Sequence, residues 1–180
     1  MIEKRIIAYS GAHGTGKTTA VYELAAEIKK YKHPAKEVGI ILETARRCPF
    51  PVLTKTTQPT RDAQIWIFAE QIRQEMEMPL KYDVVISDRT VVDCIGYSSI
   101  MGWHDLAYAQ IALARHHARV YDHVFFRGIA DNPYLKDDEF RSVDKDLQVE
   151  YERRLLEIYN ELGIKVIREG KEIEKNYTAP

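Results

Sequence analysis

The sequence predicts an α/β fold, a doubly wound parallel five-stranded sheet with helices on both faces. Two patterns predict it: short runs of consecutive apolar residues, and longer stretches between them in which apolar residues recur with helical spacing. The runs lie at residues 5–10, 38–43, 83–87, 123–128 and 165–167. Strands of a parallel sheet are buried on both faces and are therefore apolar on consecutive residues. A glycine-rich segment directly after the first run fits a loop between a strand and a helix.

The stretch between the second and third runs predicts a helix that begins after Thr60 and ends near Pro79. A threonine side chain can accept a hydrogen bond from a free backbone N–H group of the first turn, and proline does not continue a helix. The apolar residues at helical spacing, which we expect to face the core, are Ile65, Phe68, Ala69, Ile72 and Met76.

Two further helices are expected in the second half of the chain. Residues 103–120 are apolar around much of the helix circumference, which predicts a well-buried helix. The last long helix is expected to end at Gly163, because glycine favours the left-handed conformation that follows many helices. Its apolar face comprises Leu147, Tyr151, Leu155, Ile158 and Leu162.

The composition is that of one globular domain, expected over residues 1–180 and with 45% apolar content. The 26 basic and 27 acidic residues nearly cancel, which argues against nucleic acid as a partner. Cys48 and Cys94 lack metal-ligand spacing, as is typical of reduced structural thiols. No run is long enough for a signal peptide or a membrane span, so we expect a soluble cytoplasmic protein with no membrane partner. A homodimer is one expected oligomeric state.

Residues 11–18, Gly-Ala-His-Gly-Thr-Gly-Lys-Thr, match the pattern G-x-x-x-x-G-K-[ST] without a gap. Its glycines let backbone N–H groups turn toward an anion, and the N-terminus of the following helix adds positive charge. Lys17 can reach the β- and γ-phosphates of a nucleotide, and the Thr18 hydroxyl suits Mg²⁺. A chance glycine-rich turn is the alternative, but the flanking strand and helix fit a P-loop. The residues expected to bind ATP are Gly11, His13, Gly14, Thr15, Gly16, Lys17, Thr18 and Thr19.

A second signal is the apolar run that ends in Ser87, Asp88 and Arg89. A carboxylate at the carboxyl end of a strand beside the P-loop strand can hold Mg²⁺ together with Thr18. Arg89 would point into the same crevice. The alternative for Asp88 is an N-cap of the next helix, and the residue could serve in both roles.

A third signal is Glu43, which ends the second apolar run and precedes Thr-Ala-Arg-Arg. In a doubly wound sheet this carboxylate faces the same crevice, where it could accept a hydrogen bond or a proton from an attacking hydroxyl. The alternative is a salt bridge to Arg46 or Arg47.

Residues 128–146 form a long, polar and turn-rich segment, which is expected to be a lid. Arg141 is the candidate for a cation that a closing lid brings to the transition state, and Arg153 and Arg154 follow on the next helix. Acidic residues outnumber basic ones in the segment, so ion pairing of Arg141 within it is the alternative.

With these residues in place, the chain resembles the P-loop nucleoside and nucleotide kinase group. More narrowly, it is similar over nearly its whole length to the small ATP-binding family typified by the ribosylnicotinamide kinase domain of bacterial NAD-biosynthesis proteins. The resemblance rests on "GAHGTGKTT", on "ETAR" after the second strand, on "DRTVVDCIGY" after the third, and on an arginine-bearing lid before a long helix. Deoxynucleoside and thymidylate kinases are similar in the acid–arginine pair Asp88–Arg89 and, in the former, in a glutamate at Glu43.

The resemblance implies roles for several residues. Glu43 would be the base or the group that orients the acceptor hydroxyl, and Arg89 and Arg46 would grip the acceptor near its reacting oxygen. Gln71 would read an acceptor base. The positions that match the family spacing and would pack the acceptor pocket are Asp93 and Tyr97. No adenylyltransferase domain precedes the P-loop, so a bifunctional NAD-pathway enzyme is not expected.

We therefore expect a P-loop NTPase fold of the kinase type, with strand order 2-3-1-4-5, that transfers a phosphoryl group from ATP with Mg²⁺. The acceptor would be a small molecule: a nucleoside, nucleotide or related riboside. The residues expected to be catalytic are Lys17, Glu43, Asp88 and Arg141; those at the metal are Thr18 and Asp88; those at the acceptor are Glu43, Arg46, Gln71 and Arg89. The alternatives are a kinase acting on a nucleic-acid end or modified base, and a non-catalytic NTP-binding regulatory module.

Overall fold

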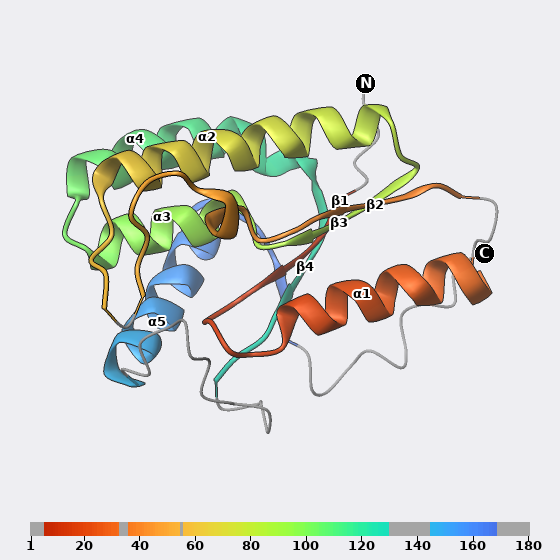
Figure 1. Ribbon diagram of the computed structural model, residues 1–180, viewed down its shortest axis with the longest axis horizontal. Helices are drawn as coiled ribbons and strands as arrows, with labels where there is room; N and C mark the ends of the chain where they lie inside the picture. The colour runs from red at the N-terminus through yellow and green to blue at the C-terminus, as the bar shows by residue number, and fades with distance from the viewer. Residues whose placement is uncertain (1–5, 33–35, 55, 130–144, 169–180) are drawn as a thin grey trace.

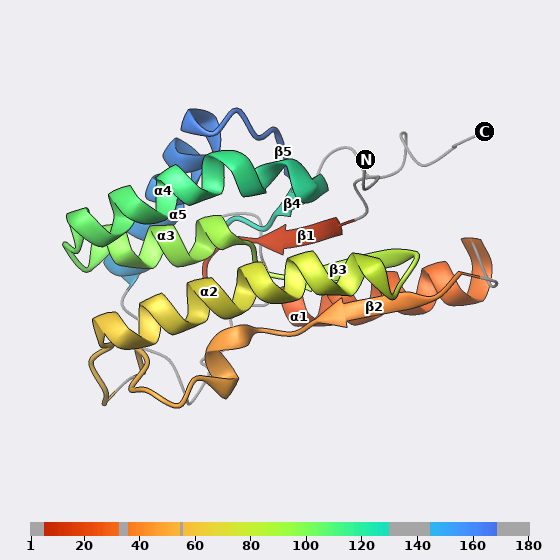
Figure 2. The same ribbon diagram turned by 90° about the horizontal axis from the view of Figure 1, so that it is seen from above.

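A five-stranded sheet forms the centre of the computed structural model, which describes residues 6–32, 36–54, 56–129 and 145–168 (Figure 1). The strands are β1 (Ile6–Ser10), β2 (Val38–Ile41), β3 (Val84–Asp88), β4 (Tyr121–Phe126) and β5 (Val166–Arg168). All four neighbouring pairs are parallel, and the order is β2-β3-β1-β4-β5, as Figure 2 also shows. The predicted fold class and strand order are therefore confirmed.

Helices cover both faces of this sheet. They are α1 (Lys17–Glu27), α2 (Arg61–Glu77), α3 (Val91–Ile100), α4 (His104–His117) and α5 (Lys145–Glu161). Alternate residues of β1 divide between two cores, because successive side chains of a strand point to opposite faces. Ile7 and Tyr9 pack with Val21 of α1 on one face, whereas Ile6 and Ala8 belong to the larger core formed with α2 to α5. Among the described helices, Figure 1 shows α1 on one side of the sheet and α2, α3 and α4 on the other.

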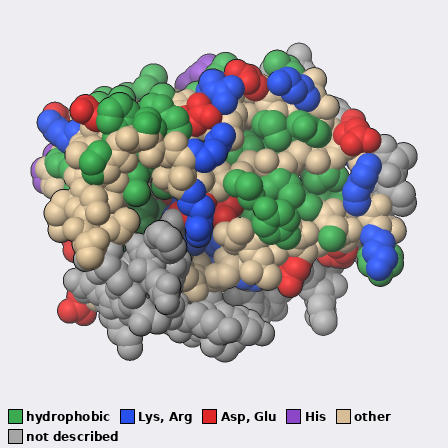
Figure 3. Space-filling model, viewed as in Figure 1, with side chains coloured by type: hydrophobic (Ala, Val, Ile, Leu, Met, Phe, Trp, Pro, Cys, Tyr) green, Lys and Arg blue, Asp and Glu red, His purple; other side chains and the backbone are tan. Residues whose placement is uncertain are grey.

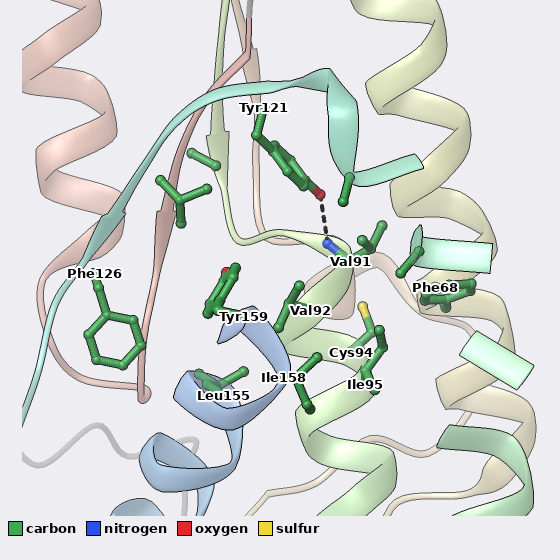
Figure 4. Packing of buried hydrophobic residues seen from close by; sticks show 14 of the residues in the cluster. Phe68, Val91, Val92, Cys94, Ile95, Tyr121, Phe126, Leu155, Ile158 and Tyr159 are labelled. Carbon is green, nitrogen blue, oxygen red and sulfur yellow. Dashed lines mark hydrogen bonds between the residues drawn. The ribbon is translucent and has the colours of Figure 1, made fainter. Parts of the chain in front are cut away.

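Helix α3 is the most enclosed helix of the larger core. Seven of its ten residues are buried, and Figure 4 shows Val91, Val92 and Ile95 between α5 and the other helices. Gly96 allows α5 to come close, because a Cβ at this position would lie 2.8 Å from side-chain atoms of Leu155 and Tyr151. The enclosed element is thus α3, and α4 is only partly buried.

The expectation of a well-buried helix over residues 103–120 is wrong. Tyr108 and Leu113 of α4 are 78% and 59% exposed, and only one side of the helix faces the core. The apolar residues of this segment extend beyond the stripe that α2 and α3 cover, so periodicity alone overstated its burial. The expectation for α5 is confirmed: Tyr151, Leu155 and Ile158 are buried.

The capping and termination of α2 are as expected, but its predicted core face is wrong. Thr60 accepts a hydrogen bond from the Ala63 amide, and the helix ends at Glu77, before Pro79. Of the predicted face, Phe68 is buried and Ile72 is half-buried, whereas Ile65, Ala69 and Met76 are exposed. The buried residues are instead Ala63, Gln64, Phe68, Gln71 and Glu75.

The polar residues of α2 can be buried because partners from other elements satisfy them. Gln71 bonds to Thr44 and Ser87, and Glu75 bonds to His117 and Tyr121. A buried polar group is costly only when it lacks such partners. The expectation that the apolar residues of a helix face the core therefore fails where a polar network occupies the interior.

The sheet register brings the carboxyl ends of four strands to one edge. Tyr9 lies beside Asp88, Ser10 beside Phe126, and Ile41 beside Ser87. The segments that follow these strands therefore meet at the same edge, which is where open α/β sheets bind ligands. No helix in the described part of the chain is long and apolar enough to cross a membrane.

Candidate active site

The loop after β1 has the backbone conformation that its glycines were expected to allow. Gly11, Gly14 and Gly16 have φ angles of 130°, 76° and 75°, which side-chain-bearing residues rarely adopt. A Cβ on Gly11 would lie 2.2 Å from the carbonyl oxygen of Arg127, at the end of β4. The loop is thus held against β4 so closely that only glycine fits.

The Lys17 side chain lies inside this loop. It is 6% exposed, and its Nζ donates to the Ala12 carbonyl oxygen at 2.5 Å and to Thr15 Oγ1 at 3.3 Å. Burial and the nearby positive charge of Arg89 lower the pKa of Lys17 to about 7, although Asp88 acts in the opposite direction. The charged form of Lys17 is therefore stabilised most when phosphate oxygens reach Nζ.

Thr18 and Asp88 converge from α1 and β3. Thr18 Oγ1 donates to Asp88 Oδ2 at 2.5 Å, so two hard oxygen ligands of the kind that Mg²⁺ prefers lie at one point beside the loop. Asp88 does not cap α3, so that alternative is wrong. Thr90 is the N-cap, and Asp93 completes a capping box with it.

Glu43 follows β2 by two residues and is 6% exposed. Its Oε1 accepts from Arg89 Nε at 2.9 Å, and its Oε2 accepts from Arg46 Nε at 3.0 Å. The crevice position and the Arg46 salt bridge are therefore both present. Arg47 pairs with Glu70 instead.

Arg89 is held from several sides and has a strained backbone. Its φ of 95° is costly for a residue other than glycine, on the order of 1–3 kcal/mol, and such strain gathers at functional sites. Its guanidinium bonds to Glu43 and, at 3.2 Å, to Asp93. Burial alone would lower the pKa of Arg89, but the Glu43 carboxylate and its neighbours outweigh it and raise that pKa well above the usual value. Arg89 is therefore a permanent cation in the crevice.

A cavity of about 370 Å³ opens beside these charged residues. Its lining is mostly apolar away from the P-loop and includes Ala63, Ile67 and Met101 together with residues of the segment between β2 and α2, namely Val52, Leu53 and Pro59. Its charged end comprises His13, Glu43, Arg46, Arg89 and Asp93. Figure 3 shows basic and acidic side chains together in a hollow near the middle of this face, with apolar areas to either side. The size falls in the range of about 300–1,000 Å³ that is usual for small-molecule sites.

The remaining residues named from the sequence lie in different surroundings. His13 is buried at the cavity, and Thr19 is exposed on the first turn of α1. Asp93 and Tyr97 line the cavity. Arg141 and almost all of the expected lid fall outside the described residues.

Gln71 reaches the cavity, but its amide is already engaged. It is 1% exposed, its Oε1 accepts from Thr44 Oγ1 at 2.8 Å, and its Nε2 donates to Glu75 Oε1 at 2.9 Å. The Gln71 nitrogen could donate to a base only by giving up one of its present partners.

Two residues at this edge of the sheet were not predicted from the sequence. Arg127 donates from Nη1 to the Gly16 carbonyl oxygen at 2.8 Å and so braces the loop. Its position is the same signal that identified Asp88, since both lie at the carboxyl end of a buried strand. Gln64 lines the cavity, and its side-chain nitrogen donates to the Cys94 carbonyl oxygen at 3.4 Å, the one hydrogen bond of this side chain within the described ranges. It lies two helical turns before Gln71 on the same face, and that spacing could have identified it.

Comparisons with known proteins agree with this geometry. The family model described as an AAA domain matches residues 6–175. Thymidylate kinase from Ehrlichia chaffeensis superposes with a TM-score of 0.60 at 16% identity, covering 94% of this chain and 90% of that one. Thymidylate kinase from Candida albicans gives 0.61 at 16% identity, covering 93% and 84%. Deoxyadenosine kinase from M. mycoides gives 0.58 at 14% identity, covering 91% and 88%.

These likenesses differ in what they establish. No curated protein matches the sequence. At 14–16% identity, the solved structures establish a shared fold. The family model spans all of the described residues. The chain therefore belongs to the AAA domain family, and its fold is that of the P-loop kinases.

Proposed function

We propose that this protein is a kinase that transfers the γ-phosphoryl group of ATP, with Mg²⁺, to a hydroxyl group of a nucleoside or related riboside. One observation carries the proposal: a small-molecule cavity opens next to the P-loop and has Glu43 and Arg89 at the end nearest that loop. A donor site and an acceptor site that share a charged boundary are what phosphoryl transfer requires.

The donor half is assigned to the loop and its neighbours. The loop N–H groups and Lys17 would hold the triphosphate, as the positive φ angles and the buried ammonium support. Thr18 and Asp88 would hold Mg²⁺, which fits their two oxygen ligands. When bound, the ion would neutralise charge on the phosphate oxygens. Arg141 remains the proposed lid cation.

Glu43 is assigned to the acceptor hydroxyl. Each of its oxygens already accepts from an arginine, but a carboxylate has about four lone-pair positions and can accept a further hydrogen bond. Arg46 and Arg89 fix the orientation of the carboxylate, so the hydroxyl would be aligned rather than merely bound. Alignment is the main protein contribution in phosphoryl transfer, where little covalent chemistry falls to side chains.

The charge at this end favours a hydroxyl acceptor over a monophosphate. Two arginines, Arg46 and Arg89, face two carboxylates, Glu43 and Asp93, so no surplus of positive charge is present among the described lining residues. A phosphate group on the acceptor would need such a surplus. A neutral riboside would not.

The far end of the cavity suits a flat ring. Its apolar lining would cover the faces of a base, and the Gln64 oxygen is available to accept from an N–H group of that base. The solved structures with this fold include thymidylate kinases and a deoxyadenosine kinase, which supports an acceptor of the nucleoside class. Ribosylnicotinamide, a riboside with a flat ring, belongs among the candidates because of the resemblance carried by Glu43 and Arg89.

The test is a panel of nucleosides, nucleoside monophosphates and ribosylnicotinamide, each incubated with γ-labelled ATP and Mg²⁺. We expect label on a hydroxyl of one or more nucleosides or ribosides. Tight ATP binding with no labelled product from the whole panel would instead favour a regulatory module, and label on oligonucleotide ends would favour a nucleic-acid kinase.

The Glu43→Gln variant tests the assigned hydroxyl-orienting role. We expect kcat to fall about 10²-fold while ATP affinity stays the same, since the amide keeps the shape and loses the charge. Glu70→Gln is the matched control, because Glu70 pairs with Arg73 outside the cavity. Equal activity of Glu43→Gln and the control would reduce Glu43 to a structural role.

A further inference from the structure

A buried polar cluster lies behind the charged end of the cavity. It consists of Gln71, Glu75, His117 and Tyr121, which we call the Glu75 cluster. None of these side chains is more than 9% exposed, and they come from α2, from the end of α4 and from the start of β4. The function proposed above assigns no role to Glu75, His117 or Tyr121.

The amide of Gln71 is bonded at both its oxygen and its nitrogen within the protein. Its oxygen accepts from Thr44 Oγ1 at 2.8 Å. Its nitrogen donates to Glu75 Oε1 at 2.9 Å, to Ser87 Oγ at 3.1 Å and to the Arg89 carbonyl oxygen at 3.3 Å. An amide nitrogen has two hydrogens, so one serves Glu75 and the other is shared by Ser87 and Arg89.

Glu75 determines which way this amide faces. Its carboxylate also accepts from the Tyr121 hydroxyl, at 2.8 and 2.9 Å, and lies 2.6 Å from His117 Nε2. Tyr121 in turn accepts from the Val91 amide at the start of α3, the contact drawn in Figure 4. Glu75 is thus fixed by two further elements, and the Gln71 nitrogen rather than its oxygen must face it.

The Arg89 backbone is the part of the site that needs this support. At a φ of 95° its conformation persists only if surrounding contacts determine it. Its amide donates to the Tyr9 carbonyl oxygen at 2.9 Å, and its carbonyl oxygen accepts from Ser87 Oγ at 2.7 Å and from Gln71. These bonds fix the Arg89 backbone from which the side chain extends, and so they fix where its guanidinium meets Glu43.

We propose that Gln71, oriented by Glu75, is a positioning residue that holds the Arg89 backbone in its strained conformation, and that it does not read the acceptor base. The catalytic part of this inference rests on the proposed kinase function. Gln64 would instead recognise the acceptor base, because its side-chain oxygen is available to the cavity.

The first test needs no activity. Arg89 Nε–H is buried and bonded to Glu43, so its hydrogen exchange, followed by NMR in the protein without ligands, reports how well the guanidinium is held. We expect Gln71→Met, which keeps the volume and removes the hydrogen bonds, to speed this exchange at least about tenfold. Ser87→Ala removes the other donor to the same carbonyl oxygen and should act in the same direction, which keeps the test valid if Gln71→Met does not fold.

Gln74→Met is the matched control. Gln74 lies on the same helix and its side chain bonds to Thr44 and Arg47, but within the described residues this side chain makes no hydrogen bond to Arg89 or Glu75. In Gln74→Met, the hydrogen-exchange rate of Arg89 Nε–H should equal that of the wild type. Unchanged exchange in a folded Gln71→Met overturns the proposal, as does unchanged exchange in Ser87→Ala where Gln71→Met does not fold, whether or not the protein is a kinase.

The second test separates positioning from base reading. If Gln71 positions Arg89, kcat falls by the same factor for acceptors with different bases, by about 10²-fold for a displacement near 1 Å. The ratio of kcat/KM between two such acceptors then stays within about threefold. A change of more than about tenfold in that ratio, with kcat preserved for one acceptor, would show that Gln71 reads the base and would overturn the proposal.

Discussion

Nucleotide binding should drive proton uptake by Lys17. Because burial and the charge of Arg89 lower its pKa to about 7 in the free protein, only about a tenth of Lys17 is protonated at pH 8. Phosphate oxygens placed at Nζ would favour the charged form and raise the pKa again. Uptake should therefore be about 0.9 proton per nucleotide at pH 8 and only about 0.1 at pH 6.

The same shift makes nucleotide affinity depend on pH. A group whose pKa is higher in the complex than in the free protein favours binding below its free pKa and opposes binding above it. If the pKa in the complex lies above about 10, the dissociation constant should rise about 50-fold from pH 7 to pH 9. Phosphate groups with a second pKa near 6 are already ionised over this range, so the nucleotide itself contributes little.

Calorimetry measures this uptake directly. The binding enthalpy of MgATP is measured at pH 8 in several buffers, and its slope against the buffer ionisation enthalpy gives the number of protons. Lys17→Arg is the control, because a guanidinium stays charged in both states and should show no uptake. Uptake near zero in the wild type, with binding intact, would refute the reasoning, and equal uptake in Lys17→Arg would assign the proton to another group.

Two further predictions concern the donor half. Asp88→Asn should weaken Mg²⁺ binding in the presence of nucleotide at least about tenfold, because a charged oxygen ligand becomes neutral; a metal titration of turnover or of fluorescence measures it, and an unchanged midpoint would remove Asp88 from the metal site. Gly11→Ala should lower the free energy of unfolding by about 3 kcal/mol or more, because the added Cβ meets the Arg127 carbonyl oxygen, whereas Gly102→Ala, with φ of 72° but nothing within 4 Å, should cost about 1 kcal/mol. Equal losses in urea unfolding would contradict the close approach of the loop to β4.

The sheet and the donor site could be predicted because their signals are local. The strands contain short runs of consecutive apolar residues, and the loop motif occupies eight consecutive positions, residues 11–18. Its anion-binding groups are backbone N–H groups, whose directions depend on the glycines within the motif. Glu43, Asp88 and Arg89 could be placed at the crevice by one rule, that parallel strands end at the same edge.

The core face of α2 could not be predicted in this way. Periodicity favoured Ile65 and Met76, yet these are exposed while Gln71 and Glu75 are buried. Burying an amide or a carboxylate is tolerated only with partners in place, and those partners come from residues 16 to 46 positions away in the sequence. Their positions depend on the completed fold, so a helix read in isolation gives the wrong face.

The strain at Arg89 shows why the acceptor half is harder to predict than the donor half. Arginine has no preference for a φ of 95°, and the groups that impose this conformation, Ser87, Gln71 and the Tyr9 carbonyl oxygen, lie on three different elements. The cavity is likewise lined by side chains from the P-loop, the segment after β2, α2 and α3. A substitution at Gln64 could therefore change which acceptor binds while every motif residue of the donor site stays the same. For this reason the proposed donor half follows from a motif, whereas the proposed acceptor follows from the shape and charge of the cavity.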